Sequence, residues 1–293
     1  MKSLAWASSL RSVAGVALLV AFLPTPPRLR AQALAPSASQ IVHRMVLAES
    51  AAWKHRQHFL YRKQERSDRT KGHVWEEFAV ETSDGTLERL MSIDGKPLSS
   101  EQDRLEEERI ANFVRHPGEF RRQTNRRKEE EGRMPGLLGE LGEIFVFANQ
   151  GKQGDCTRIA FRPNPSFQEK TYQDRVVHAM SGVMWIGTTD MRLRKLDVHL
   201  DHRVEFGFGL LGNVRETTHF SLVRKEVLPG RWEPSRVRVH LDGSVLLVKS
   251  ISRDVDSLQY GFQLVPHDLT VAQAAEMVRS EGQLSTLAVQ KRQ

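Results

Sequence analysis

The chain has 293 residues, of which 39% are hydrophobic and 27% are charged, and it contains one cysteine, Cys156. A single cysteine excludes a disulfide scaffold, so a hydrophobic core must stabilise the fold. The formal net charge is +7, but the first 33 residues contain four of the positive charges and no acidic residue, which leaves +3 for the rest. This small excess argues against a nucleic-acid-binding protein, because such proteins need a concentrated basic surface.

The N-terminal segment has the pattern of a secretory signal peptide. Lys2 and Arg11 supply a basic start, an apolar run covers residues 13–23, and "AQA" ends at Ala33 as a small-residue cleavage site. The run is too short to cross a hydrocarbon layer of ~30 Å as a helix, and the "PTPP" that follows it disfavours a longer helix. We therefore expect residues 1–33 to be a signal peptide, cleaved near Ala33, and the mature protein to be periplasmic or secreted. A single membrane anchor is the alternative.

Helical and strand patterns alternate in the next hundred residues. Apolar residues recur at helical spacing over 38–53, where Ser37 or Ser39 is positioned to cap the helix. Three segments with strand patterning follow, at 58–67, 73–83 and 85–98. A charged helix with a narrow apolar stripe is expected over 100–114, and Pro117 ends it. The mixed charges of 121–131 indicate a solvated helix or loop, with an interaction arm as the alternative.

From Ile144 to Val265 the sequence is mostly a succession of strand-like runs separated by Gly, Pro and Asp. Such runs without intervening helices are typical of consecutive antiparallel strands. A short helix is expected over 268–280, followed by a flexible tail over 281–293. The sequence therefore predicts one α+β domain over residues 34–280, with a strongly curved antiparallel sheet and helices on its concave side.

The stretch "LDVHLDHRVEFGFGLL", residues 196–211, has the composition of a metal-ligand cluster. If it is a strand, Asp197, His199 and Asp201 lie on one face and His202 lies on the other, with the apolar residues. One metal ion could then reach all four side chains only if the strand bulged. The unbroken alternation of polar and apolar residues favours a solvated strand face, so we predict no metal site here.

Other catalytic signatures are also missing. His55 and His58 lack an acid and a third ligand in helical register, and nothing beside Cys156 would activate its thiol. The chain has no G-x-S-x-G, Walker or G-x-G-x-x-G motif. We therefore expect no catalytic residue and no cofactor, and we expect Cys156 to be a small strand residue.

The strands supply more large apolar side chains on one face than the two expected helices are able to cover. Such a face either fills its own concavity as plain core or leaves an apolar cavity. The residues that we predict to line a cavity of this kind are Met184, Trp185, Val198, Leu200, Val204, Phe206, Phe208, Phe220 and Trp232.

The order of these segments resembles that of the outer-membrane lipoprotein-sorting proteins. The matching stretches are "FLYRKQERS", "LERLMSIDGKPLS", "EEERIANFV", "FRPNP", "SGVMWIGTTDMRLRKLDVHLDHRVEFGFG" and "GRWEPSRVRVHL". The likeness extends over nearly all of the mature chain, although the insertion "QTNRRKEEEGRMPGLLGELGE" is longer than expected. The resemblance implies a half-open β-barrel with helices in its mouth, and a periplasmic carrier or sensor with an acyl-chain cavity. It carries over no ligand-binding residue by position.

Three functional hypotheses follow. The first is an extracytoplasmic binding protein for a hydrophobic ligand, such as an acyl chain or a lipoprotein, with an envelope protein as a further partner. The second is a non-catalytic structural or regulatory interaction module with a filled barrel. The third is a secreted metal-dependent hydrolase that uses the Asp197, His199 and Asp201 face.

Overall fold

The computed structural model describes residues 36–132, 134–207, 212–245 and 249–290. The chain divides into two units, Met1–Ala35 and Pro36–Gln293, and only the second contains described residues. The predicted signal peptide and Phe208 therefore lie outside the described residues.

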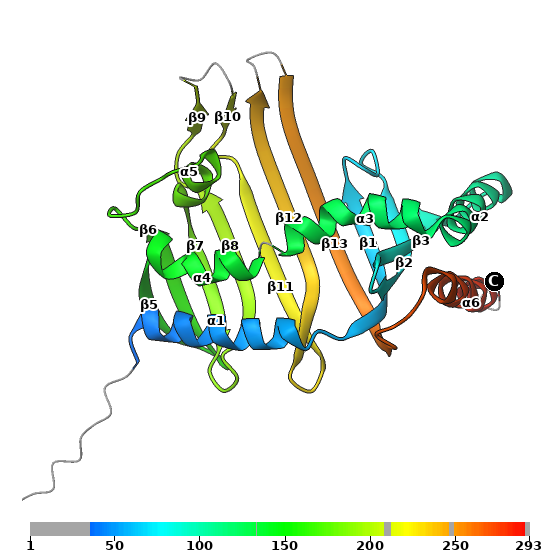
Figure 1. The fold of residues 1–293 in the computed structure, drawn as a ribbon, viewed down its shortest axis with the longest axis horizontal. Helices are drawn as coiled ribbons and strands as arrows, with labels where there is room; N and C mark the ends of the chain where they lie inside the picture. The colour runs from blue at the N-terminus through cyan, green and yellow to red at the C-terminus, as the bar shows by residue number, and fades with distance from the viewer. Residues whose placement is uncertain (1–35, 133, 208–211, 246–248, 291–293) are drawn as a thin grey trace, which may run out of the picture. The chain divides into compact units, whose positions relative to one another are not determined.

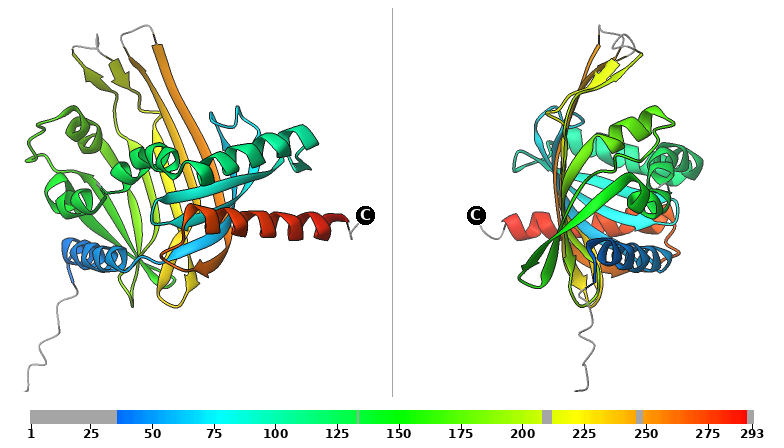
Figure 2. Two further views of the ribbon diagram at one scale, coloured as in Figure 1. Left: turned by 45° about the vertical axis from the view of Figure 1, so that its right-hand side comes forward. Right: turned by 90° about the vertical axis from the view of Figure 1, so that its left-hand side faces the viewer.

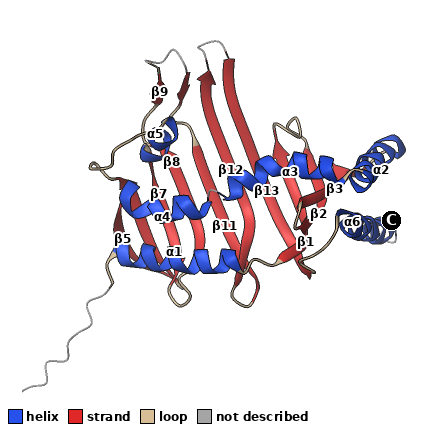
Figure 3. Ribbon diagram, viewed as in Figure 1, coloured by secondary structure: helices blue, strands red, loops and turns tan. Residues whose placement is uncertain are grey.

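Thirteen strands in the described part of the chain form one antiparallel sheet with the order β4-β3-β2-β1-β13-β12-β11-β8-β7-β6-β5, and the short β9 and β10 pair beside it (Figures 1 and 3). The strands are β1 His58–Ser67, β2 Val74–Thr82, β3 Gly85–Ile93, β4 Lys96–Pro97, β5 Phe145–Gln153, β6 Cys156–Pro163, β7 Met180–Gly187, β8 Leu193–Leu200, β9 Val204–Phe206, β10 Gly212–Val214, β11 His219–Leu228, β12 Arg231–Val245 and β13 Lys249–Val265.

The helices are α1 Ala38–Lys54, α2 Ser100–Arg115, α3 Pro117–Gly132, α4 Met134–Ile144, α5 Tyr172–His178 and α6 Val271–Gln290. Ser37 and Ser99 cap α1 and α2, and each exchanges hydrogen bonds with a glutamine three residues further on. Proline begins α3, where a missing backbone N–H costs nothing. No helix of the described part combines the length and hydropathy needed to span a membrane.

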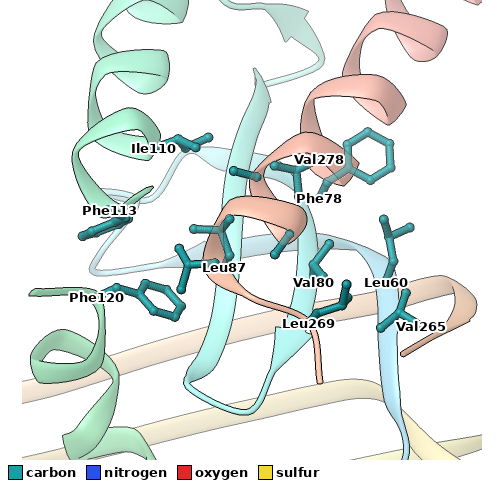
Figure 4. Close-up of a cluster of buried hydrophobic side chains, with 13 residues drawn as sticks. Leu60, Phe78, Val80, Leu87, Ile110, Phe113, Phe120, Val265, Leu269 and Val278 are labelled. Atoms are coloured by element: carbon teal, nitrogen blue, oxygen red, sulfur yellow. The ribbon is translucent and has the colours of Figure 1, made fainter. Parts of the chain in front are cut away.

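Two hydrophobic cores lie on opposite faces of the sheet. In the first core, β1–β3 pack against α2, α3 and α6 through residues that include Leu60, Leu87, Ile110 and Val278 (Figure 4). In the second, α1 and the start of β5 pack against β6–β8. The register of β1 with β2 places Leu60 and Val80 on the face opposite to Lys63 and Glu77. We call the face that carries the second core the α1 face.

The α+β class and the antiparallel sheet are confirmed, but the expected strong curvature is wrong. The sheet is not closed or strongly curled, and its edge strands β4 and β5 stand at opposite ends of the strand order. Figure 1 shows α1 and α4 in front of β5–β8, whereas α2 and α6 lie beyond β1–β3. Figure 2 shows the same elements from two further directions. Helices pack on both faces, so the sheet buries its apolar rows without curling around a single concave side.

Several local predictions also need correction. Asp201–Arg203 interrupt the predicted long strand, so β8 ends at Leu200 and β9 begins at Val204. Helix α5 lies within residues 144–265, which were expected to be mostly strand, and a capping box formed by Thr171 and Asp174 begins it. Residues 281–290, expected in the tail, belong to α6.

Candidate functional site

A row of half-buried apolar side chains crosses the middle of the sheet on the α1 face. Val198, Phe220, Val239 and Val255 are paired in register on four neighbouring strands. Leu196, Leu222 and Val237 form a second row beside them. All seven are partly accessible, unlike the closed cores at either side. We call these seven residues the central stripe.

At its β13 end the central stripe opens into a cavity of about 600 Å³, which we call the polar cavity. Val237 and Val255 belong both to the central stripe and to the lining of the polar cavity. The other lining residues are mostly polar or charged: Lys63, Glu65, Ser67, Asp68, Arg69, Glu88, Gln123, Arg253, Asp254, Ser257 and Gln259. The apolar rows thus lead directly to a polar wall.

Lys63 is the centre of this wall and is 4% exposed. Its Nζ lies 3.1 Å from Glu65, 2.9 Å from Glu77 and 2.5 Å from Glu88. Burial opposes the charge on Lys63, but the three carboxylates outweigh burial and raise its pKa. Arg69 donates to both Glu65 and Glu77, so two cations hold three carboxylates together.

Beside Leu222, a second cavity of about 330 Å³ lies between the end of α1 and the strands β8, β11 and β12, and we call it the α1 cavity. Leu222 of the central stripe lines it, together with Trp53, Leu138, Leu193 and Pro234. The stripe therefore connects two cavities of different character.

Ion pairs hold α1 over the α1 cavity. Oε1 of Glu49 accepts hydrogen bonds from Arg192 Nε, Arg224 Nη1 and the backbone N–H of Leu193, each at 2.9 Å. Burial would raise the pKa of Glu49, but Arg224 and Arg192 outweigh burial and lower it. The carboxylate is thus held ionised between two arginines.

Six of the predicted lining residues fall in three places. Val198 and Phe220 belong to the central stripe. Met184 is buried in the core beneath α1, whereas Leu200, Val204 and Phe206 pack together near α5 and β10. The structure does not bring these groups together around one cavity.

The two predicted tryptophans have different surroundings. Trp185 follows Met184 on the same strand, so it projects from the opposite face, where Lys195 Nζ lies 4.3 Å from its ring centre. Trp232 packs against the guanidinium of Arg194, 3.1 Å from its ring centre. Neither tryptophan lines the polar cavity or the α1 cavity.

The Asp and His residues at and just after the end of β8 contact their near neighbours in the sequence or on β7. Asp197 forms an ion pair with Lys195 at 2.6 Å, Nε2 of His199 lies 3.2 Å from Oδ1 of Asp201, and Ser181 donates to Asp201. In the described part of the chain, no three His, Cys, Asp or Glu side chains come together as a metal site.

Cys156 lies on β6 and is 8% exposed. Burial and the hydrogen bond to Asp155 raise the pKa of its thiol to about 11, which leaves little thiolate at neutral pH. The expectation of a small strand residue is therefore confirmed.

Sequence reasoning missed Leu196, Leu222, Val237, Val239 and Val255. The stretches "HFSLV" and "SRVRVHL" do alternate, which places Leu222 on one face of its strand and Val237 with Val239 on one face of theirs. Their alignment into rows depends on the pairing of β8, β11, β12 and β13, which the pattern of a single strand does not contain.

The polar cavity also makes stability depend on pH. Burial opposes the charge on Glu65, but Arg69, Lys63 and Ser67 lower its pKa from 4.5 to about 2. The stabilisation that results is fully present at pH values above 4.5, the pKa of Glu65 in the unfolded chain. It is lost as the pH falls from 4.5 towards 2. Allowing for solvent screening, we expect Glu65 to account for about 1–2 kcal/mol of lost unfolding free energy between about pH 5 and pH 3. Urea-induced unfolding of the wild type and of Glu65→Gln measures this loss. The difference in unfolding free energy between the two proteins should become smaller at low pH, and a difference that does not change with pH would contradict the prediction.

No protein-family model matches the chain, and no curated protein matches it. Among solved structures, the chain is similar to a LolA superfamily protein from Nitrosomonas europaea, at 8% sequence identity and a TM-score of 0.25. The match covers 79% of this chain and 95% of that protein.

Proposed function

We propose that the central stripe binds the apolar chain of an amphiphilic ligand, and that the protein is an extracytoplasmic, non-catalytic carrier or sensor of such ligands. The observation that supports this proposal is the register of the two apolar rows. They continue from a closed core into a partly accessible surface that ends at the polar cavity. Contiguous accessible apolar surface of this kind commonly marks a binding site.

The dimensions favour a single alkyl chain. Four neighbouring strands carry the rows, and at about 4.8 Å between strands these span roughly 14 Å. An alkyl chain needs no directional hydrogen bond, and each CH₂ that it buries contributes about 0.8 kcal/mol. Affinity is therefore expected to rise with chain length until the chain fills the stripe.

A fluorescent probe with a decyl chain and a neutral head tests the proposal. Leu222 and Val223 are neighbours on β11 with opposite orientations, and Val223 is 37% exposed on the face away from the stripe. We expect Leu222→Gln to weaken probe binding by about tenfold, because it places an amide in the apolar row. Val223→Gln is the matched control and should change binding less than about twofold.

Circular dichroism and melting temperature check that both variants fold. If the wild type binds no neutral alkyl probe, or if the two variants weaken the probe equally, the stripe is not the binding site. A protein that binds no alkyl probe would instead fit the hypothesis of a non-catalytic interaction module.

A further inference from the structure

The polar cavity is positioned to hold the head of the ligand whose chain lies on the central stripe. Val237 and Val255 line the cavity and also belong to the stripe, so a chain on the stripe directs its polar end into the cavity. We infer that the polar cavity selects a ligand head that carries an ammonium group. This inference rests on the proposed function, because it assigns the second half of the same ligand.

An unpartnered hydroxyl supports a site for a polar head. Ser257 pairs with Val237 and thus continues the row of the stripe onto β13. It is 5% exposed, it lines the polar cavity, and its Oγ has no hydrogen-bond partner among the described residues. A buried hydroxyl without a partner costs free energy, whereas an alanine would not. A ligand group that donates to Oγ would remove this cost.

The charges around the cavity favour a cationic head. The ammonium of Lys63 has three protons, and carboxylate oxygens of Glu65, Glu77 and Glu88 lie within 3.1 Å of its Nζ. Arg69 is shared between Glu65 and Glu77. Three carboxylates thus face two cations, so this cluster carries an excess of one negative charge, which disfavours an anionic head.

Three further charged residues line the same cavity, namely Asp68, Arg253 and Asp254. Asp68 and Asp254 add two carboxylates: Oδ2 of Asp68 accepts the backbone N–H of Asp254, and Oδ1 of Asp254 lies 2.6 Å from Nδ1 of His240. Asp68, Arg253 and Asp254 are all exposed, so water and salt screen all three charges, and together they add one negative charge to that of the Lys63 cluster. An ammonium head is able to donate both to carboxylate oxygens and to Ser257 Oγ, and charge-assisted hydrogen bonds of this kind are the strong ones.

Three ligands with the same dodecyl chain separate the contribution of the head to the affinity from that of the chain. They are dodecylamine, a neutral dodecyl probe without a hydroxyl group, and dodecanoate. Each competes with the fluorescent decyl probe on the full mature protein at pH 7. We expect dodecylamine to bind about tenfold more tightly than the neutral probe, and dodecanoate to bind about tenfold more weakly.

Variants then assign the preference to the cavity. Ser257→Ala and Asp68→Asn should each weaken dodecylamine about threefold to tenfold and leave the neutral dodecyl probe unchanged. Ser257→Ala should not lower the melting temperature, because it removes an unpartnered hydroxyl. Ser221→Ala, on the opposite face of β11, is the matched control and should change neither ligand.

The possible outcomes are distinct. If the neutral probe binds but dodecylamine and dodecanoate bind equally, or if Ser257→Ala and Asp68→Asn both leave dodecylamine binding unchanged, the head site is wrong and the chain site stands. If no dodecyl ligand binds, the proposed function fails and the head site fails with it.

Discussion

Replacing Lys63 with methionine is expected to lower the free energy of unfolding by about 3 kcal/mol at pH 7, because it leaves buried carboxylates without their partner. Glu77 is 3% exposed, and it would then share Arg69 with Glu65. Methionine keeps the length of the side chain, so the loss reports the charge rather than the packing. Urea-induced unfolding, followed by circular dichroism, measures it.

The control for Lys63→Met is Lys225→Met, which changes an exposed lysine on β11. Exposed substitutions of this kind usually stay within about 0.5 kcal/mol. The loss from Lys63→Met should also shrink below pH 4.5, where the carboxylates of the unfolded chain take up protons. If both lysine variants have the same stability at pH 7, the buried network does not stabilise the β1–β3 end of the sheet.

Replacing Glu49 with glutamine is expected to cost about 3 kcal/mol, and to loosen α1 from the sheet. Arg192 is 8% exposed, and it would lose its anionic partner together with Arg224. The amide keeps the size of the side chain but cannot neutralise two guanidinium groups. Hydrogen exchange of α1 amides, measured together with thermal unfolding, should show faster exchange in the variant.

Glu276→Gln on α6 is the matched control, because Glu276 is an exposed helical glutamate. It should leave both the unfolding free energy and the exchange of α1 unchanged. Unaltered α1 exchange in Glu49→Gln would mean that apolar packing against β6–β8 is enough to hold the helix.

The elements that were predicted well are those whose signals are local. Ser37 stands just before apolar residues at helical spacing, and Ser99 stands just before the charged segment that was expected to be a helix over 100–114. Both serines cap helices close to the expected positions. The long runs of alternating polar and apolar residues were correctly predicted as strands for the same reason. Helix α5 was missed because its seven residues are too few to show a helical period, and only the Thr171 cap marks its start.

The curvature of the sheet was not predictable from strand patterns. Alternation shows that a strand has an apolar face, but it does not show which helix covers that face. Here α6 covers β2 and β3 on one face and α1 covers the other face at the far end. Both assignments depend on contacts between residues that are far apart in the sequence.

The same limit applies to the candidate site. Val198 and Phe220 were found because each lies on the apolar face of an alternating run. Trp185 was included with Met184, although adjacent residues on a strand project from opposite faces. Lys63 was missed because its three glutamates come from β1, β2 and β3, and no local pattern indicates that they converge.

Methyl NMR of the protein with ¹³C-labelled valine and leucine tests the central claim most directly. On addition of a neutral decyl ligand, we expect the methyl signals of Leu222, Val237, Val239 and Val255 to shift together and to saturate at one ligand per chain. The signal of Val223, on the opposite face, should stay in place. Binding that leaves the stripe signals unchanged, or that shifts Val223 instead, would contradict the account.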